Sequence, residues 1–93
     1  MNHVEFDWDF ENIRHIARHG VTPEEAEEAL SGDILEVSTE DDFTEERFAE
    51  VGMTKDGRIL LVVTTLRHQR LRVVTAFEPN VRIKKYYLVA RGL

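Results

Sequence analysis

The chain contains no cysteine among its 93 residues. This absence excludes disulfide bonds, iron–sulfur clusters and thiolate zinc sites, and it is typical of proteins that stay in a reducing cytoplasm. No segment approaches the run of about eighteen apolar residues that a membrane-spanning helix needs, and no signal-peptide pattern opens the chain. We therefore expect a cytoplasmic protein with no membrane association. Because 42% of the residues are apolar and 32% are charged, we expect one folded domain over residues 1–93.

Positive charge is scarce in the first half of the chain and abundant in the second. The net charge is -6, but residues 1–50 hold three basic and sixteen acidic side chains, whereas residues 51–93 hold nine basic and two acidic ones. One interpretation is that the acidic half neutralises the basic half. The other is that the basic half presents a face to a polyanion, since the local field decides what binds. Composition alone does not choose between them.

Two helices are predicted near the N-terminus. Asp9 is placed as an N-cap, and the spacing of Phe10, Ile13 and Ala17 predicts a helix with these side chains on one face. The stretch "TPEE" then supplies Thr22 as a second N-cap, followed by proline at the first helical position.

Alternating or continuous apolar patterns predict extended segments at residues 4–8, 34–38, 46–54, 58–66 and 71–77. The Asp-Gly pair in "KDGR" predicts a hairpin between residues 46–54 and 58–66. "ILLVVTTL" is apolar on both faces and predicts a central strand. Residues 80–90 are predicted to form a closing helix. The expected fold class is α+β, with two N-terminal helices, an antiparallel sheet of about four strands, a short C-terminal helix, and helices covering one face of the sheet.

A turn at residues 67–70 sets the register of the last two predicted strands. The expected cross-strand pairs are Arg67 with Arg70, Thr65 with Arg72, and Val63 with Val74. The guanidinium groups of Arg67, Arg70 and Arg72 would then gather on one face at one end of the sheet. They could bind a phosphate-rich ligand, splay into water, or be neutralised by the acidic stretch around Asp41 and Asp42.

The histidines favour no metal site. His15 and His19 are four residues apart and would share a helix face, but no acidic ligand is placed beside them by a motif, so we interpret them as a surface pair. His68 lies in the predicted turn among the arginines, where it could titrate near neutral pH.

Three stretches occur in this order along roughly residues 5–77: "FDWDFENIRHIARHGVTPEEAEEAL", "GMTKDGRILLVV" and "LRVVTA". Together they resemble the BrnT family of toxins from bacterial type II toxin–antitoxin systems. The resemblance implies a fold similar to that of RelE ribonucleases, an RNA-cleaving activity and no cofactor. It also implies a small antitoxin partner, commonly BrnA, which binds DNA as a dimer and through which the toxin could form an oligomer. The family's usual Ser-Ala-Arg appears in this chain as Thr75, Ala76 and Phe77, so the expected arginine is missing, and Thr64 replaces a tyrosine that is frequent in the central strand.

Metal-free RNA cleavage needs a base for the 2′-hydroxyl, cations for the charge on phosphorus and an acid for the 5′-oxygen. The catalytic candidates in this sequence are Arg67, Arg72, Glu78, Lys85 and Tyr86. The RNA-binding candidates are Arg47, Arg58, His68, Arg70, Arg82 and Lys84. We expect the arginines of the last turn to converge beside the C-terminal helix in one pocket that is open to solvent.

A second hypothesis belongs to a different class. The chain would be a catalytically degenerate BrnT-like binding module that acts through a partner protein. Phe77 favours this hypothesis, because it replaces a charge with an apolar contact.

Overall fold

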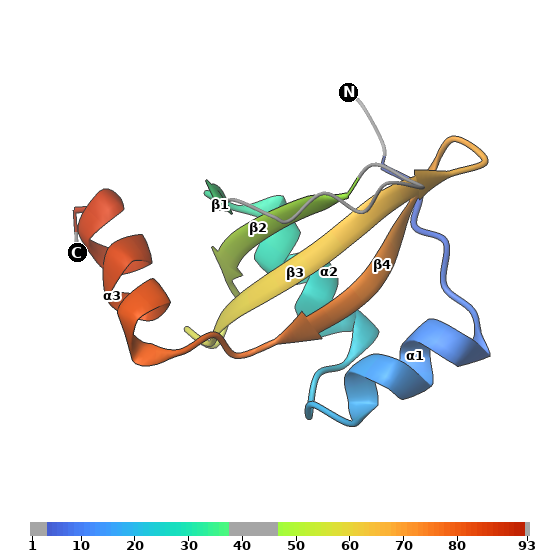
Figure 1. Ribbon diagram of the computed structural model, residues 1–93, viewed down its shortest axis with the longest axis horizontal. Helices are drawn as coiled ribbons and strands as arrows, with labels where there is room; N and C mark the ends of the chain where they lie inside the picture. The colour runs from blue at the N-terminus through green and yellow to red at the C-terminus, as the bar shows by residue number, and fades with distance from the viewer. Residues whose placement is uncertain (1–3, 38–46, 93) are drawn as a thin grey trace.

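The computed structural model describes residues 4–37 and 47–92. Its elements follow the order α1 (Phe10–Ala17), α2 (Pro23–Ser31), β1 (Leu35–Val37), β2 (Phe48–Met53), β3 (Ile59–Arg67), β4 (Arg70–Phe77) and α3 (Val81–Ala90). The strands of this described part form an antiparallel sheet in the order β1-β2-β3-β4 (Figure 1). The predicted α+β class is confirmed. None of the helices in these two ranges is long and apolar enough to cross a membrane.

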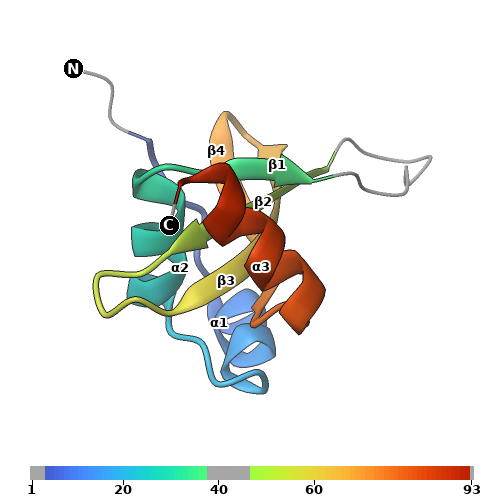
Figure 2. The same cartoon turned by 90° about the vertical axis from the view of Figure 1, so that its left-hand side faces the viewer.

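The helices cover both faces of the sheet, so the prediction that they share one face is wrong. On one face, α1 and α2 bury Ile16, Val21 and Ala26 against strand residues such as Leu60 and Val62. On the other face, α3 inserts the fully buried Tyr87 into a second cluster. Figure 2 shows α3 in front of the strands, with α1 and α2 behind them. This cover on both sides explains why β3 is apolar in both phases of its alternation.

Helix α1 is rotated relative to the prediction. Its buried residues are Asn12 and Ile16, whereas Phe10 is 72% exposed and the other residues predicted to share its face, Ile13 and Ala17, also reach solvent. The reason is polar: the Asn12 side-chain amide donates to the main-chain oxygens of Asp7, at 2.9 Å, and of Val73 in β4, at 3.1 Å. Buried polar groups need such partners. These two hydrogen bonds therefore set the rotation of the helix against its apolar pattern.

The N-terminal segment lies along the outer edge of β4. Phe6 forms a parallel bridge with Leu71, where the main-chain nitrogen of Asp7 donates to the oxygen of Leu71 and the nitrogen of Leu71 donates to the oxygen of Glu5, each at 2.9 Å. The predicted opening strand is thus reduced to a single bridge. Side chains alternate in an extended segment, so Phe6 and Trp8 turn toward the core while Asp7 between them turns away and contacts Arg67.

The register of β3 with β4 contains a β-bulge. Arg67 pairs with Arg70 and Thr65 with Arg72, as predicted, but Val63 pairs with Thr75 instead of Val74. Because Val74 is an extra residue, the side-chain alternation of β4 shifts by one position after it. Val73 and Ala76 consequently both reach the core that packs against α1 and α2, although they are an odd number of residues apart.

Helix α2 makes its closest approach to the sheet at Gly52 in β2. A β-carbon built on Gly52 would lie 1.8 Å from the main-chain oxygen of Ala29 in α2. This approach requires glycine because the obstacle is backbone, which cannot rotate away as a side chain can.

We predict that Gly52→Ala lowers the free energy of unfolding by at least about 2 kcal/mol, because α2 must move away from β2. Chemical denaturation followed by circular dichroism measures the change. Gly32→Ala is the matched control: no atom lies within 4 Å of the position that its new β-carbon would take, so a change within about 0.5 kcal/mol is expected. Equal destabilisation by both variants would contradict the steric explanation.

Candidate functional site

A cavity of about 640 Å³ opens where α1 meets β3 and β4. It is lined by Glu11, Asn12, His15, Arg47, Thr65, Arg67, Arg72, Val73, Val74 and Thr75. It therefore combines three arginines with a histidine, a residue type that titrates near neutral pH. Of the predicted candidates, the cavity contains Arg47, Arg67 and Arg72.

The β-bulge builds one wall of this cavity. Because Val74 is extra, Arg72 and Thr75 share a face of β4, as their partners Thr65 and Val63 share a face of β3. Bulges frequently re-aim side chains beside functional sites. Here the shift aims the Thr75 hydroxyl at α1, where it lies 3.1 Å from Nε2 of His15.

His15 belongs to the cavity and was missed as a candidate from the sequence. It is half-buried rather than fully on the surface, and its ring meets that of His19 edge-on, with 5.5 Å between ring centroids. The His19 ring in turn contacts Phe77, at 5.9 Å. The available signal was the spacing of three residues from Asn12, which places His15 on the same side of α1 as this buried asparagine.

The guanidinium groups of β3 and β4 meet the acidic side chains of the N-terminal segment in what we call the ion-pair ladder. Arg72, only 8% exposed, is bidentate to Asp9, with nitrogen–oxygen distances of 3.0 and 3.1 Å. The Nε of Arg67 donates to Asp7 at 2.8 Å. The ladder also includes four longer ion pairs, given with their nitrogen–oxygen distances: Arg70 with Glu5 (3.3 Å), Arg67 with Asp9 (3.7 Å), Arg72 with Asp7 (3.6 Å) and Arg72 with Glu11 (3.5 Å).

The ladder answers the question that the charge asymmetry raised. Three guanidinium groups face four carboxylates, so the acidic half of the chain neutralises this part of the basic half. The alternative partners named from the sequence, Asp41 and Asp42, lie outside the described residues. The hydrogen bond from Arg72 is the main reason that the pKa of Asp9 lies below its usual range, and the same contact raises the pKa of Arg72.

A second polar cluster lies where β4 leads into α3. Glu78 accepts from Lys84 at 2.9 Å and from Arg58 at 3.1 Å, and these two contacts lower the pKa of its carboxyl group, with Lys84 the larger cause. Arg58 also donates to Glu25 at 3.0 Å and to the main-chain oxygen of Gly20 at 2.8 Å. Glu78 is thus held as a carboxylate between two cations, and Arg58 is engaged in joining three segments.

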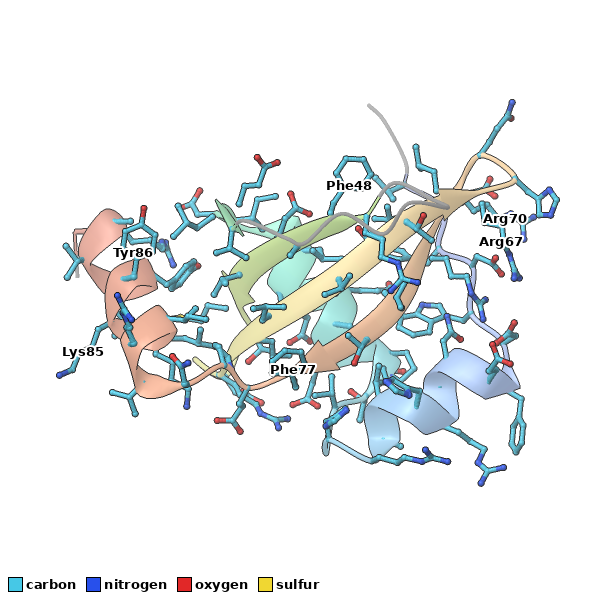
Figure 3. The ribbon with its side chains drawn as sticks, in the orientation of Figure 1. Phe48, Arg67, Arg70, Phe77, Lys85 and Tyr86 are labelled. Carbon is cyan, nitrogen blue, oxygen red and sulfur yellow. The ribbon has the colours of Figure 1, made fainter. Side chains whose placement is uncertain are left out.

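The predicted single pocket beside the C-terminal helix does not form. Figure 3 shows Arg67 and Arg70 at the β3–β4 turn and Lys85 and Tyr86 at the opposite end of the molecule. A phosphate group held at one end cannot contact the other. The two remaining candidates divide in the same way: Arg82 lies on α3, and the exposed His68 lies in the turn, where its φ is +53°.

Among the described residues, no group of three or more histidine, aspartate or glutamate side chains is placed to hold a metal ion. The polar groups that line the cavity are the His15 imidazole, three guanidinium groups, two threonine hydroxyls, the Glu11 carboxylate and the Asn12 amide.

We predict that Asp9→Asn lowers the thermal unfolding midpoint at pH 7. Asparagine still caps α1, so the loss isolates the charge contact with Arg72. Because the pKa of Asp9 is lowered in the folded state, its stabilisation is present above the unfolded pKa of about 3.9 and is lost as the pH falls through the folded value. Calorimetric scans of both proteins should therefore converge in acid.

Asp33→Asn is the matched control, because Asp33 pairs with Arg91 at 3.0 Å while remaining 79% exposed. Exposed pairs contribute little, so this variant should unfold close to the wild-type midpoint at every pH. A constant offset for Asp9→Asn from pH 7 down to acid would exclude the carboxylate charge as the cause.

Comparison with known proteins identifies the family. The model of the family described as "Ribonuclease toxin, BrnT, of type II toxin-antitoxin system" matches residues 8–80, which include α1, α2 and the whole sheet. No curated protein matches the chain. The match covers well over half of the sequence and agrees with the resemblance found in its motifs. The chain therefore belongs to the BrnT family of type II toxin–antitoxin ribonuclease toxins.

Proposed function

We propose that this protein cleaves RNA without a metal ion, and that cleavage takes place in the cavity between α1 and β4. The family match over residues 8–80 carries this proposal. The cavity supports it, because His15 supplies an imidazole that can accept a proton, and Arg47 and Arg67 supply positive charge on the same surface. Its volume of about 640 Å³ is sufficient for a nucleotide-sized group.

In the proposed reaction, Nε2 of His15 accepts the proton of the ribose 2′-hydroxyl. The 2′-oxygen forms a bond to phosphorus while the bond from phosphorus to the 5′-oxygen breaks, and the departing 5′-oxygen takes a proton from water. The products are a 2′,3′-cyclic phosphate and a free 5′-hydroxyl. Charge on the phosphoryl oxygens is stabilised by guanidinium groups, for which Arg67 and Arg47 are the candidates.

Arg72 has a positioning role in this scheme. Both of its terminal nitrogens are engaged by Asp9, so it holds the N-terminal segment and α1 against β4. Arg70 is more exposed and remains a candidate for contacting RNA outside the cavity. Lys85 and Tyr86 are left out of the proposed catalytic group because they lie at the opposite end of the molecule.

We also propose that the protein acts in the cytoplasm and is neutralised by an antitoxin. Its membership of a type II family implies such a partner. A BrnA-like protein that binds DNA as a dimer would hold the toxin in a larger complex.

The ion-pair ladder favours the second hypothesis, a binding module without catalysis. Arg67, Arg70 and Arg72 each contact a carboxylate, which leaves less positive charge for phosphate. Catalysis by this cavity then depends on competition of RNA with the carboxylates for the guanidinium groups, such as Arg67 held by Asp7. One experiment decides between the two hypotheses.

Purified protein is incubated with a mixed-sequence RNA in the presence of EDTA, and cleavage is followed on gels and by detection of cyclic phosphate. Wild-type protein should cleave. His15→Ala should reduce the rate at least about 100-fold, because general acid–base catalysis typically contributes that much or more. The wild-type pH–rate profile should contain an acid limb that the variant lacks, because the base must be unprotonated to accept the 2′-hydroxyl proton.

His68→Ala is the control for a histidine outside the cavity and should cleave within a few-fold of wild type. Thermal unfolding of each variant checks that it is folded. A wild-type protein that leaves RNA intact but retains the protein encoded by the adjacent reading frame in a pull-down supports the binding module instead. Full activity of a folded His15→Ala protein would place the chemistry elsewhere in the molecule.

A further inference from the structure

The outer face of α3 carries apolar side chains that the described part of the chain leaves uncovered. Val81, Tyr86 and Val89 are 66%, 61% and 73% exposed. At about 100° per residue they spread over an arc of about 140° around the helix, with Val89 between the other two, and over a length of about 12 Å. Tyr86 and Val89 border a groove of about 650 Å³, whose remaining lining residues are Asn80, Arg82, Ile83 and Lys85.

This surface, which we call the α3 face, is positively charged. Helix α3 contains no acidic residue, and its basic residues are Arg82, Lys84 and Lys85. Lys84 is engaged by Glu78 at 2.9 Å, whereas Arg82 and Lys85 make no ion pair with any of the described residues. The α3 face thus combines an apolar row with two cations whose charge is not balanced by a described neighbour.

The opposite side of the helix is firmly anchored. Tyr87 is fully buried, and its hydroxyl donates to the main-chain oxygen of Asp33 at 2.8 Å. Arg91 donates to Asp33 at 3.0 Å and to the Tyr87 hydroxyl at 3.2 Å. The α3 face is therefore presented on a rigid support, which lowers the entropic cost of binding a partner.

We propose that the α3 face binds the antitoxin, and that the bound element is an amphipathic helix with Asp or Glu residues beside its apolar row. The proposal rests on the assignment of this chain as a toxin with an antitoxin partner. The apolar side chains of the α3 face can pack against the apolar face of a second helix, and acidic side chains on that helix would meet Arg82 and Lys85. Charge complementarity of this kind raises the association rate and sets the orientation.

Two other occupants fit this surface less well. RNA would gain from the cations and from stacking on Tyr86, but the aliphatic side chains of Val81 and Val89 offer it neither a charge nor a ring. A second copy of the chain, docked face to face about a two-fold axis, would bring the same cations together. An acidic helix is the occupant that uses both the apolar row and the charge.

The test measures binding of the full-length chain to the protein encoded by the adjacent reading frame, by isothermal titration calorimetry. Val89→Asp should raise Kd at least about tenfold, because it places a carboxylate in the apolar row and repels acidic side chains. The double variant Arg82→Glu and Lys85→Glu should also raise Kd at least about tenfold, and in stopped-flow mixing it should slow association most at low salt.

Phe10→Asp is the matched control, since Phe10 is 72% exposed on α1, at a distance from α3. Its Kd should stay within about twofold of wild type, and circular dichroism verifies that all variants are folded. Unchanged antitoxin binding by Val89→Asp, or equal loss in Val89→Asp and Phe10→Asp, would overturn the proposal. The proposal would also be overturned if the toxin alone formed a dimer that Val89→Asp dissociates. It would be overturned as well if Val89→Asp weakened binding of a short RNA but not of the antitoxin. Either result would assign the α3 face to another occupant.

The RNA assay separates this inference from the proposed function. Val89→Asp protein without antitoxin should cleave RNA at the wild-type rate, and added antitoxin should inhibit it only at higher concentration. If wild-type protein does not cleave RNA, the proposed function fails, while the calorimetric comparison still decides whether the α3 face binds the antitoxin.

Discussion

The contact between Arg72 and Asp9 is the interaction on which the rest of the site depends. Arg72 is nearly buried in β4, and an unpaired charge in such a position is costly, so a carboxylate must stay beside it. Asp9 is also the N-cap of α1, which places the start of that helix at β4. One side chain thus neutralises an arginine, begins a helix and brings His15 toward Thr75. The contact between Asp9 and Arg72 therefore determines both the charge balance of the cavity and the position of α1 along its wall.

Local sequence patterns predicted the parts of the fold that local interactions determine. The Asp-Gly turn between β2 and β3, the capping box of α2 at Thr22, and the pairing of residues 65–67 with 70–72 were all predicted correctly. Each depends on residues that are close together along the chain.

The errors arose where distant contacts override a local pattern. The rotation of α1 follows from the contact of Asn12 with Val73, 61 residues away, which no helical periodicity reveals. The bulge at Val74 has no glycine to mark it, so the register was extended past it. The extended segment at residues 4–8 was predicted from its apolar residues Val4, Phe6 and Trp8 alone. The residues that alternate with them are the acidic Glu5, Asp7 and Asp9. This acidic alternation indicated which carboxylates pair with the arginines of β3 and β4.

The position of the N-terminal segment has a consequence for how the molecule remains separate from its neighbours. An outer strand with unsatisfied main-chain groups is a template on which another polypeptide can add, and such additions seed aggregates. At Leu71 these groups of β4 are already occupied by Glu5 and Asp7, while at the opposite margin β1 is only three residues long. The same acidic segment that balances the arginines therefore also shields one border of the sheet from unwanted polymerisation.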